Sequence, residues 1–353
     1  MSAPRIVIAA GGTAGHVVPA IAVADALRAE GAEVSFVGGQ RAEAELVPAA
    51  GYPLDPIRVE GISRTNPLAA ARAAGKAALA LREAGAILRR RGADAVLGGG
   101  GYVAGPVGLA AVVRRVPLVL TEADSHMGLS NRLLAPRARR VCLAFPIAGR
   151  DGERYLVTGR PVPPRDADRA GARAALGIGE EERCVLVFGG SLGARSVNEA
   201  AVAAFADAPY RVLHVAGRRD FAELEAPGPR YDLRDYLTPF GPALAAADLS
   251  VARAGGSIFE LAQYGLPAVL VPYPHATADH QSANARWMEQ GGAAVVIADD
   301  ALTPERLRAA VDAILLDPAR LRAMADASAH LARPDAARDV ARAVLAAAGG
   351  PTA

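Results

Sequence analysis

Short runs of apolar residues alternate with longer segments of helical composition along most of the 353-residue chain. This alternation is typical of βα units on a parallel sheet, whose buried strands read as short apolar runs. In the first half, the expected strands are Arg5–Ala10, Val34–Val37, Ala95–Leu97, Leu118–Thr121, Val141–Phe145 and Tyr155–Val157. In the second half, they are Cys184–Phe188, Arg211–Val215, Asp235–Leu237, Leu249–Ala252, Ala268–Val271 and Ala294–Ile297. The pattern predicts an α/β protein with two similar halves.

A proline cluster, Pro161-Val162-Pro163-Pro164, separates the halves. Proline cannot continue a helix or a central strand and it stiffens a connection, so this cluster is a candidate linker. The length of the chain also favours two domains, each able to bury a core. The tail from Thr303 is helical in composition, with a break at Arg333-Pro334 and a last apolar-periodic run over Ala336–Ala347.

Composition narrows the class of protein. Apolar residues make up 52% of the chain and mixed charges 22%, which excludes a disordered chain. Cys142 and Cys184 stand far apart in expected strands, so we expect free buried thiols and no metal site. The first residues enter a strand without a signal-peptide pattern, and no apolar run is long enough to span a membrane. We therefore expect a cytosolic protein that does not cross the membrane.

Charge is distributed unevenly along the chain. Residues 1–160 carry 20 basic and 13 acidic side chains, a net charge of +7, whereas the remainder carries −5. A basic first half suits an anionic lipid surface or a phosphorylated acceptor, although an uneven spread of arginines gives the same numbers. The basic, alanine-rich segment Asn66–Arg91 is either a membrane-surface helix or an ordinary helix docked on the sheet. The net charge of the whole chain is +2. We expect no nucleic-acid partner.

The first glycine-rich turn, Gly11-Gly12-Thr13-Ala14-Gly15-His16, follows the first strand and leads into an apolar-periodic helix. Backbone N–H groups at such a helix start favour an anion. The turn has neither the G-x-G-x-x-G spacing of dinucleotide-binding proteins nor the Gly-Lys-Ser/Thr of a P-loop. His16 is a candidate general base or phosphate donor, with a purely structural role as the alternative.

Three further segments follow expected strands. Two are glycine-rich turns, Gly98–Pro106 and Gly189–Ala194, and the third is the acidic segment Thr121–His126. Carboxyl ends of parallel strands share one edge of a sheet, so these segments belong beside a ligand crevice. Two facing α/β domains with such turns predict an enzyme with a cleft.

The stretch from Arg253 to Asn284 combines a turn and a helix start. Gly255, Gly256 and Ser257 lie between an expected strand and a helix, where they either cradle a phosphate or simply shape a tight turn. Glu260 lies about one turn into that helix, where its carboxylate can accept hydrogen bonds from two sugar hydroxyls. Together they suggest a nucleotide with a ribose and a diphosphate.

Seven segments, in order along nearly the whole chain, resemble the N-acetylglucosaminyltransferases of peptidoglycan synthesis (MurG-type). They are GGTAGHVVPAIAVADAL at Gly11–Leu27, GGYVAGP at Gly100–Pro106, LVLTEADSHMGLSNRLLA at Leu118–Ala135, AFP at Ala144–Pro146, GGSLGARSVN at Gly189–Asn198, RAGGSIFELAQYGLPAVLVPYPHATADHQSANA at Arg253–Ala285 and GGAAVVI at Gly291–Ile297.

The resemblance implies a GT-B fold, in which two Rossmann-like doubly wound domains face a cleft. Residues 1–160, with a C-terminal helix at about 335–350, would form the acceptor and membrane-facing domain, and residues 161–334 the UDP-sugar donor domain. Implied donor contacts are Ser191, Gly255, Gly256, Ser257 and Gln281 for diphosphate and sugar, Glu260 for the ribose and Leu237 for the uracil. Implied acceptor-side residues are Thr13, Ala14, Gly15, Asp124 and Asn131, with His16 as the catalytic base.

The implied reaction is inverting. The 4-hydroxyl of undecaprenyl-diphosphate-linked N-acetylmuramyl-pentapeptide attacks the anomeric carbon of UDP-N-acetylglucosamine from the face opposite UDP, while a base takes its proton. No Asp-x-Asp metal clamp is evident at the glycine-rich turns, so we expect no cofactor and no required metal, with helix N-termini stabilising the leaving diphosphate. The implied location is cytoplasmic, peripheral on the inner face of the cell membrane.

Several positions depart from the family pattern. Ala14 replaces a glycine, Thr121 and Asp124 replace a histidine and an asparagine, Arg160-Pro161-Val162-Pro163 replaces Asn-Pro-Val-Arg, and the donor turn is one residue shorter. Either Arg160 or Arg165 could stand in for the missing family arginine. These departures keep open a related UDP-sugar transferase with another lipid or natural-product acceptor, and a nucleotide-sugar epimerase or non-catalytic sugar-binding protein.

Overall fold

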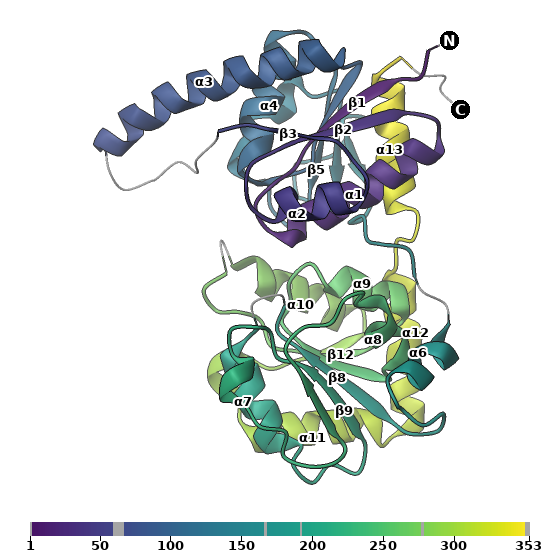
Figure 1. Ribbon diagram of the computed structural model, residues 1–353. Coiled ribbons are helices and arrows are strands. Elements are labelled where there is room, and N and C mark those ends of the chain that lie inside the picture. Colours follow the sequence, from purple (N-terminus) through teal and green to yellow (C-terminus); the bar gives the residue numbers. More distant parts are fainter. Residues whose placement is uncertain (1, 59–66, 166–167, 191–192, 277–278, 350–353) are drawn as a thin grey trace. The chain divides into compact units, whose positions relative to one another are not determined.

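The computed structural model describes residues 2–58, 67–165, 168–190, 193–276 and 279–349, with the backbone alone at 67–78. The chain folds into two compact units, unit 1 from Met1–Pro163 with Arg333–Ala353 and unit 2 from Pro164–Ala332. Each unit has helices on both faces of a parallel sheet (Figure 1). One change of unit falls inside the proline cluster and the other at the break before the final helix.

Unit 1 is built on a seven-stranded sheet of order β3-β2-β1-β4-β5-β6-β7 within the described residues. The strands are β1 Arg5–Ala9, β2 Glu33–Gly38, β3 Leu54–Pro56, β4 Ala95–Gly98, β5 Leu118–Glu122, β6 Arg140–Leu143 and β7 Tyr155–Val157. Its helices are α1 Ala14–Ala29, α2 Ala42–Ala49, α3 Pro67–Arg91, α4 Gly101–Val113, α5 Leu129–Leu134, the short 3-10 helix η1 Ala135–Arg137, and α13 Ala336–Ala347.

Alternation along β1 separates the two cores of unit 1. Ile6 and Ile8 point into a core shared with α1 and α13, whereas Val7 and Ala9 point into a core shared with α3 and α4. Helix α13 packs against α1, so the end of the chain completes the first of these cores. Ile87 and Leu88 of α3 are buried in the second, so the described part of this helix docks on the sheet.

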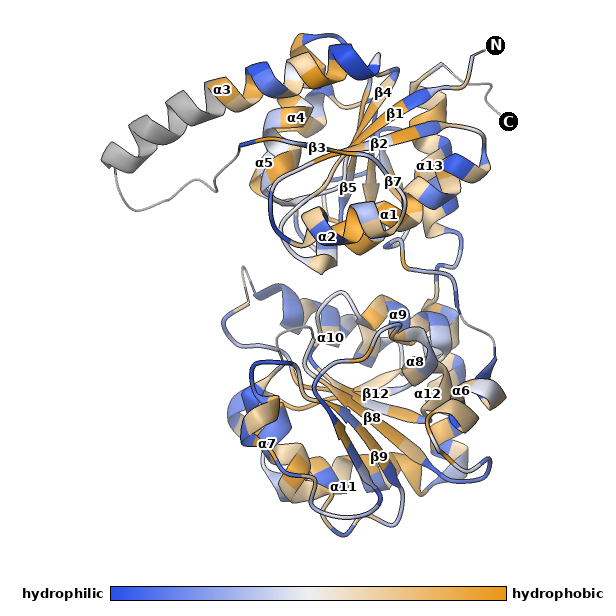
Figure 2. Ribbon diagram, viewed as in Figure 1, coloured by the Kyte–Doolittle hydropathy of each residue, from blue (hydrophilic) through white to orange (hydrophobic). Residues whose placement is uncertain are grey.

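Unit 2 has a six-stranded sheet of order β10-β9-β8-β11-β12-β13 within the described residues. The strands are β8 Cys184–Phe188, β9 Arg211–Val215, β10 Tyr231–Arg234, β11 Leu249–Ala252, β12 Ala268–Leu270 and β13 Ala294–Val296. The helices are α6 Arg169–Ala175, α7 Arg195–Ala204, η2 Phe221–Glu223, α8 Gly241–Ala246, α9 Ile258–Tyr264, α10 His280–Gln290, η4 Asp299–Ala301, α11 Pro304–Leu315 and α12 Pro318–Leu331. Figure 2 shows that the strands of both sheets are mostly apolar.

Both sheets are parallel and doubly wound, which confirms the predicted fold class. In each, the strand order reverses beside the first strand of the unit, between β1 and β4 in unit 1 and between β8 and β11 in unit 2. The crevice outside the carboxyl ends of strands at such a switch point is where doubly wound sheets bind ligands.

The observed strands differ from the expected ones in two places. The strand predicted at Asp235–Leu237 ends earlier, as β10 at Arg234, and the Tyr236 N–H donates to the Asp235 carboxylate at 2.7 Å instead of to a neighbouring strand. The edge strand β3 was not predicted, since three residues ending in Pro56 give no apolar run.

Candidate functional site

The switch point of unit 1 brings together the turns that follow β1 and β4. Gly11, Gly12 and Thr13 lead from β1 into α1, and Gly99 and Gly100 lead from β4 into α4. The two turns meet closely, because a Cβ at Gly101 would lie 1.8 Å from the Gly11 carbonyl oxygen. Gly101 also has a φ of +77°, so only glycine fits this contact without strain. The glycine-rich turns after β1 and β4, which are distant in the sequence, are therefore in direct contact.

His16 lies in the first turn of α1, next to these two turns. Its Nδ1 lies 3.4 Å from the Thr13 hydroxyl, and a Cβ at Gly100 would lie 2.7 Å from its Cδ2. Burial lowers the pKa of His16 below its ordinary value, the Arg160 guanidinium lowers it further, and Asp124 opposes them. The imidazole is therefore neutral near pH 7, the form that can accept a proton.

Glu122, at the end of β5, carries the buried carboxylate of the site. Its Oε2 accepts hydrogen bonds from Asn131 Nδ2 at 2.9 Å and from the Gly128 N–H at 2.8 Å, and its Oε1 accepts the Asp124 N–H at 3.3 Å. Burial raises the pKa of Glu122, these hydrogen bonds oppose the rise, and the nearby Asp124 charge adds to it.

Asn131 serves the same cluster. Its amide nitrogen donates to both Glu122 and the Thr121 carbonyl oxygen, at 2.9 Å each, and the side chain is buried. Asp124 is half-buried two residues beyond Glu122. The structure thus places Asn131 behind Glu122, and Asp124 close enough to His16 to influence its charge.

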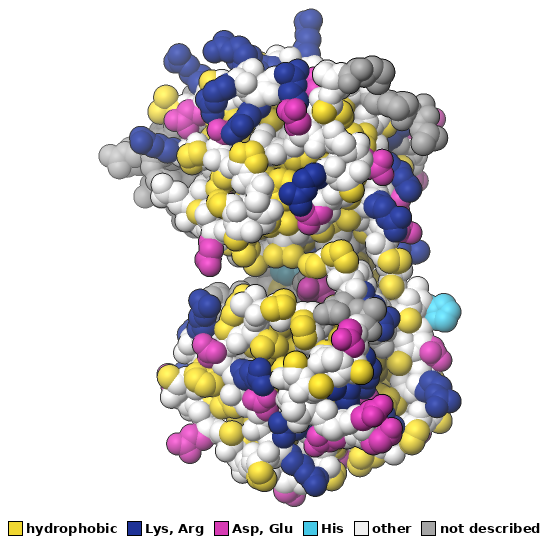
Figure 3. Space-filling model, turned by 45° about the vertical axis from the view of Figure 1, so that its right-hand side comes forward, with side chains coloured by type: hydrophobic (Ala, Val, Ile, Leu, Met, Phe, Trp, Pro, Cys, Tyr) yellow, Lys and Arg dark blue, Asp and Glu magenta, His cyan; other side chains and the backbone are white. Residues whose placement is uncertain are grey.

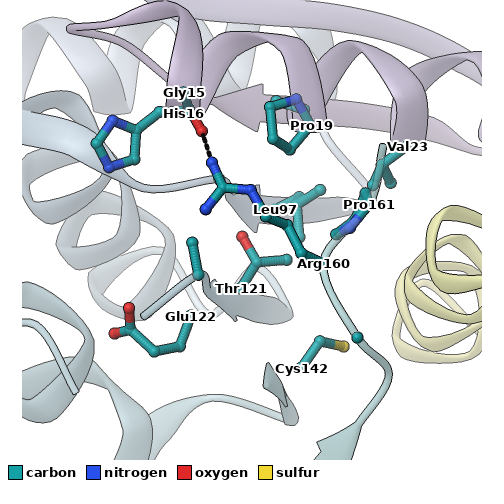
Figure 4. A pocket seen from close by; sticks show the side chains of 14 residues that line it. Gly15, His16, Pro19, Val23, Leu97, Thr121, Glu122, Cys142, Arg160 and Pro161 are labelled. Carbon is teal, nitrogen blue, oxygen red and sulfur yellow. Dashed lines mark hydrogen bonds between the residues drawn. The ribbon is translucent and has the colours of Figure 1, made fainter. Parts of the chain in front are cut away.

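Arg160, after β7, reaches into the same pocket. Its Nη2 donates to the Gly15 carbonyl oxygen in α1. Figure 4 shows its guanidinium between the start of α1 and the end of β5, with His16, Thr121 and Glu122 around the same pocket. Arg165, in contrast, stacks over Tyr264 in unit 2, with its guanidinium carbon 5.8 Å from the ring centre. Of the two candidate replacements for the missing arginine, Arg160 is the one in this pocket.

At the switch point of unit 2, a glycine-rich turn follows β11. Gly255, Gly256 and Ser257 connect β11 to α9, and all three are half-buried. The carbonyl oxygens of Gly255 and Gly256 accept the N–H groups of Ile258 and Phe259, each at 3.3 Å. Glu260 lies in the first turn of α9 and is also half-buried.

Gln281, from the first turn of α10, lies against this turn. The Tyr273 N–H donates to its Oε1 at 2.9 Å, which fixes the orientation of the amide. A Cβ at Gly255 would lie 4.0 Å from its Nε2, so the donor end of the amide faces the turn. Gln281 and Gly255, 26 positions apart in the sequence, thus come together in the fold.

Arg253 lies just before the Gly255 turn and holds it in place through its side-chain hydrogen bonds, a role that the sequence did not reveal. Its buried guanidinium donates to Asp299 Oδ1 at 2.6 Å and to Ser196 Oγ at 2.8 Å. It also donates to the carbonyl oxygens of Val271 and Pro272, after β12. One side chain thereby joins the ends of β11 and β12 to α7 and to the segment after β13.

Two further residues were expected at the donor site. Ser191 lies outside the described residues. Leu237 is half-buried in the loop after β10, and Phe240 of that loop packs on Phe188 at the end of β8, with ring centres 5.1 Å apart. The loop therefore returns toward the switch point.

The described residues contain neither a metal-binding cluster nor a membrane-spanning helix. No three His, Cys, Asp or Glu side chains gather there in a way that could hold a metal ion. Nor does that part of the chain contain a helix long and apolar enough to cross a membrane.

Comparison with known proteins covers both units. Residues 6–143 match the glycosyltransferase family 28 N-terminal domain, and residues 184–340 match the glycosyltransferase family 28 C-terminal domain. The chain is 42% identical to the UDP-N-acetylglucosamine–N-acetylmuramyl-(pentapeptide) pyrophosphoryl-undecaprenol N-acetylglucosamine transferase of Methylococcus capsulatus, over 98% of this chain and 99% of that protein. It is 43% identical to the protein of the same name from Salinibacter ruber, over 98% and 97% of the two chains.

A solved structure gives the same relationship. The crystal structure of MurG from Acinetobacter baumannii matches with a TM-score of 0.78 and 30% identity, over 97% of this chain and 99% of that chain.

Proposed function

The chain belongs to glycosyltransferase family 28, and on this premise we propose that it transfers N-acetylglucosamine from UDP-N-acetylglucosamine to the 4-hydroxyl of undecaprenyl-diphosphate-linked N-acetylmuramyl-pentapeptide. The observation that carries this proposal is the 42% identity, over 98% of the chain, to a relative named for that transfer. The reaction forms the second lipid-linked intermediate of peptidoglycan synthesis and is a hexosyl transfer without a cofactor.

Unit 2 is the proposed donor domain. Gly255, Gly256 and Ser257 would hold the diphosphate, and Gln281 Nε2, which faces this turn, would donate to the diphosphate or the sugar. Glu260 would accept hydrogen bonds from the ribose hydroxyls. Ser191 and Leu237 keep their expected roles at the diphosphate and the uracil. Arg253 would act indirectly by holding the turn in place.

Unit 1 is the proposed acceptor domain. Thr13, Ala14 and Gly15 stand at the start of the 16-residue helix α1, where N–H groups favour the acceptor diphosphate. Neutral His16 would accept the proton of the attacking hydroxyl. Arg160 would supply positive charge to the acceptor diphosphate, and Asp124 would contact a sugar hydroxyl. The amide nitrogen of Asn131 already donates to the Thr121 carbonyl oxygen and to the Glu122 carboxylate, so its proposed role is to orient Glu122.

A lipid-linked acceptor requires access to a membrane surface, and we place that contact on unit 1. Helices α4 and α5 pack against each other, and each exposes an apolar pair one turn apart: Leu109 and Val113 at 44% and 66%, and Leu129 and Leu133 at 49% and 64%. Exposed Arg114 and Arg132 stand beside these pairs in the sequence, where they suit anionic headgroups. Figure 3 shows further Arg side chains gathered over the top of this unit. The proposed location is the inner face of the cell membrane.

The acceptor can be tested with a panel. Protein and UDP-N-acetylglucosamine are incubated with the lipid-linked muramyl-pentapeptide, with an unrelated glycolipid or with a natural-product aglycone, and UDP release is measured. We expect release only with the first. Release only with another acceptor would favour the related transferase that the departures at Thr121 and Asp124 suggest. Epimerised hexosamine without any acceptor would contradict both transferase readings.

A further inference from the structure

Glu43 is a buried carboxylate without a role in the reaction described above. It lies in the first turn of α2 and its side chain is fully buried. Its Oε2 accepts the Gly12 N–H at 2.8 Å, and its Oε1 accepts the Gly39 N–H and the Tyr102 hydroxyl, both at 2.8 Å. Burial alone would raise the pKa of Glu43, but these hydrogen bonds outweigh it and the pKa is lowered. The carboxylate is therefore ionised at neutral pH.

Three glycines leave the space that this carboxylate occupies. A Cβ at Gly11 would lie 2.8 Å from Glu43 Oε1, and one at Gly38 would lie 2.8 Å from Glu43 Cγ. At Gly39, a Cβ would lie 1.9 Å from the Tyr102 hydroxyl. The turns after β1 and β2 are thus shaped around one acidic side chain, which is held by three donors.

The contacts of Glu43 lead to both sides of His16. Gly12 immediately precedes Thr13, whose hydroxyl lies 3.4 Å from His16 Nδ1. Tyr102 stands two residues beyond Gly100, where a Cβ would lie 2.7 Å from His16 Cδ2. A shift of Gly12 would therefore move Thr13, and a shift of Tyr102 would move Gly100, and both of these residues lie next to His16.

From this arrangement we propose that Glu43 is a positioning residue for transfer, which holds the Gly12 turn and the start of α4 around His16. It also engages the Gly12 N–H, so the N–H groups left for an acceptor anion at this turn begin at Thr13. The proposal rests on the proposed function, because it assigns the turn to the acceptor.

Replacement of Glu43 by glutamine tests this positioning role. Glu43→Gln keeps the size of the side chain but offers one acceptor oxygen to donors that now meet two oxygens. In either amide orientation, the –NH₂ group of the new side chain faces a backbone N–H, so the Gly12 or the Gly39 turn must move. A misplacement of about 1 Å costs roughly 10²-fold in rate. We therefore expect kcat/KM for the acceptor to fall by about 10- to 100-fold, with an unchanged KM for the donor.

Three further measurements complete the test. Glu45→Gln removes the same charge from an exposed position of α2 and should leave kinetics unchanged. Amide hydrogen exchange at Gly12 or Gly39 should accelerate in Glu43→Gln but not in Glu45→Gln. Tyr102→Phe, which removes one donor and disturbs the fold less, should lower acceptor kcat/KM by a few-fold, again with donor KM unchanged.

The outcomes separate this proposal from the proposed function. If the unaltered protein shows no transfer, the proposed function fails, while the exchange measurement still tests the anchoring by Glu43. Acceptor kcat/KM within twofold of the unaltered protein in Glu43→Gln would overturn the proposal. So would an equal loss of donor affinity, because that loss would indicate general disruption. If Glu43→Gln does not fold, unchanged acceptor kinetics in Tyr102→Phe would overturn it.

Discussion

Gly100 lies against the imidazole of His16, so closely that a Cβ at position 100 would stand 2.7 Å from His16 Cδ2. Gly100 also has a φ of +96°, which L side chains rarely adopt. Gly100→Ala should therefore displace His16 and lower kcat by about tenfold or more. Steady-state kinetics measure the effect. Gly152→Ala, at a φ of +79° with open space around it, is the matched control for backbone strain and should retain kcat.

His16 should set the acidic limb of the pH–rate profile. As the base, it must be neutral, so acceptor kcat/KM should fall as the pH drops through its pKa. That limb should lie below about pH 6.5, the ordinary value for histidine, because burial and Arg160 lower the pKa. Asp124→Asn should move the limb to lower pH and Arg160→Gln to higher pH, since they remove charges that raise and lower this pKa.

Substitution of His16 tests its role directly. Loss of a general base costs roughly two to four orders of magnitude, so His16→Ala should lower kcat by that amount. A change confined to the acceptor KM would instead make His16 a phosphate ligand. An acidic limb that persists unshifted in His16→Ala would assign the titration to another group.

Glu260 should govern donor binding. If the Glu260 carboxylate accepts hydrogen bonds from two ribose hydroxyls, as proposed, its removal leaves those hydroxyls unpaired, so Glu260→Ala should raise the donor KM by about tenfold or more. The acceptor KM should remain unchanged, and Glu289→Ala, at an exposed position of α10, should leave both constants unchanged. An unaltered donor KM in Glu260→Ala would remove this residue from the site.

The apolar pairs on α4 and α5 should determine membrane association. Leu133→Glu places a charge on a side chain that is 64% exposed, so folding should be little affected while sedimentation with anionic vesicles should fall severalfold. Leu316→Glu, at a 56% exposed leucine of unit 2, is the control. Equal sedimentation of both variants would place the membrane contact elsewhere.

Local patterns in the sequence predicted much of this structure. The strand, turn and helix around Gly11–His16 and around Gly255–Glu260 are contiguous, so apolar runs and glycines suffice to place them. The strand expected at Asp235–Leu237 ends earlier, at Arg234, and the Tyr236 N–H donates to the Asp235 carboxylate, a hydrogen bond that the apolar pattern does not register.

The residues that support each of the two sites could not be predicted from such patterns. Glu43 meets Gly12 across 31 positions and Arg253 meets Asp299 across 46, and nothing in the intervening sequence marks either pair. Because each pair forms only when strands of one sheet align, its role follows from the sheet. Arg160 is a similar case, since only the fold shows that it, and not Arg165, lies beside His16.

The most direct test of the central claim is the structure of the product formed from UDP-N-acetylglucosamine and lipid-linked N-acetylmuramyl-pentapeptide. Mass spectrometry and NMR of that product should show one added N-acetylglucosamine on the 4-hydroxyl of the muramyl sugar, with the anomeric configuration of the donor inverted and one UDP released per linkage. A product with the donor configuration retained, or UDP release without a disaccharide, would contradict the account.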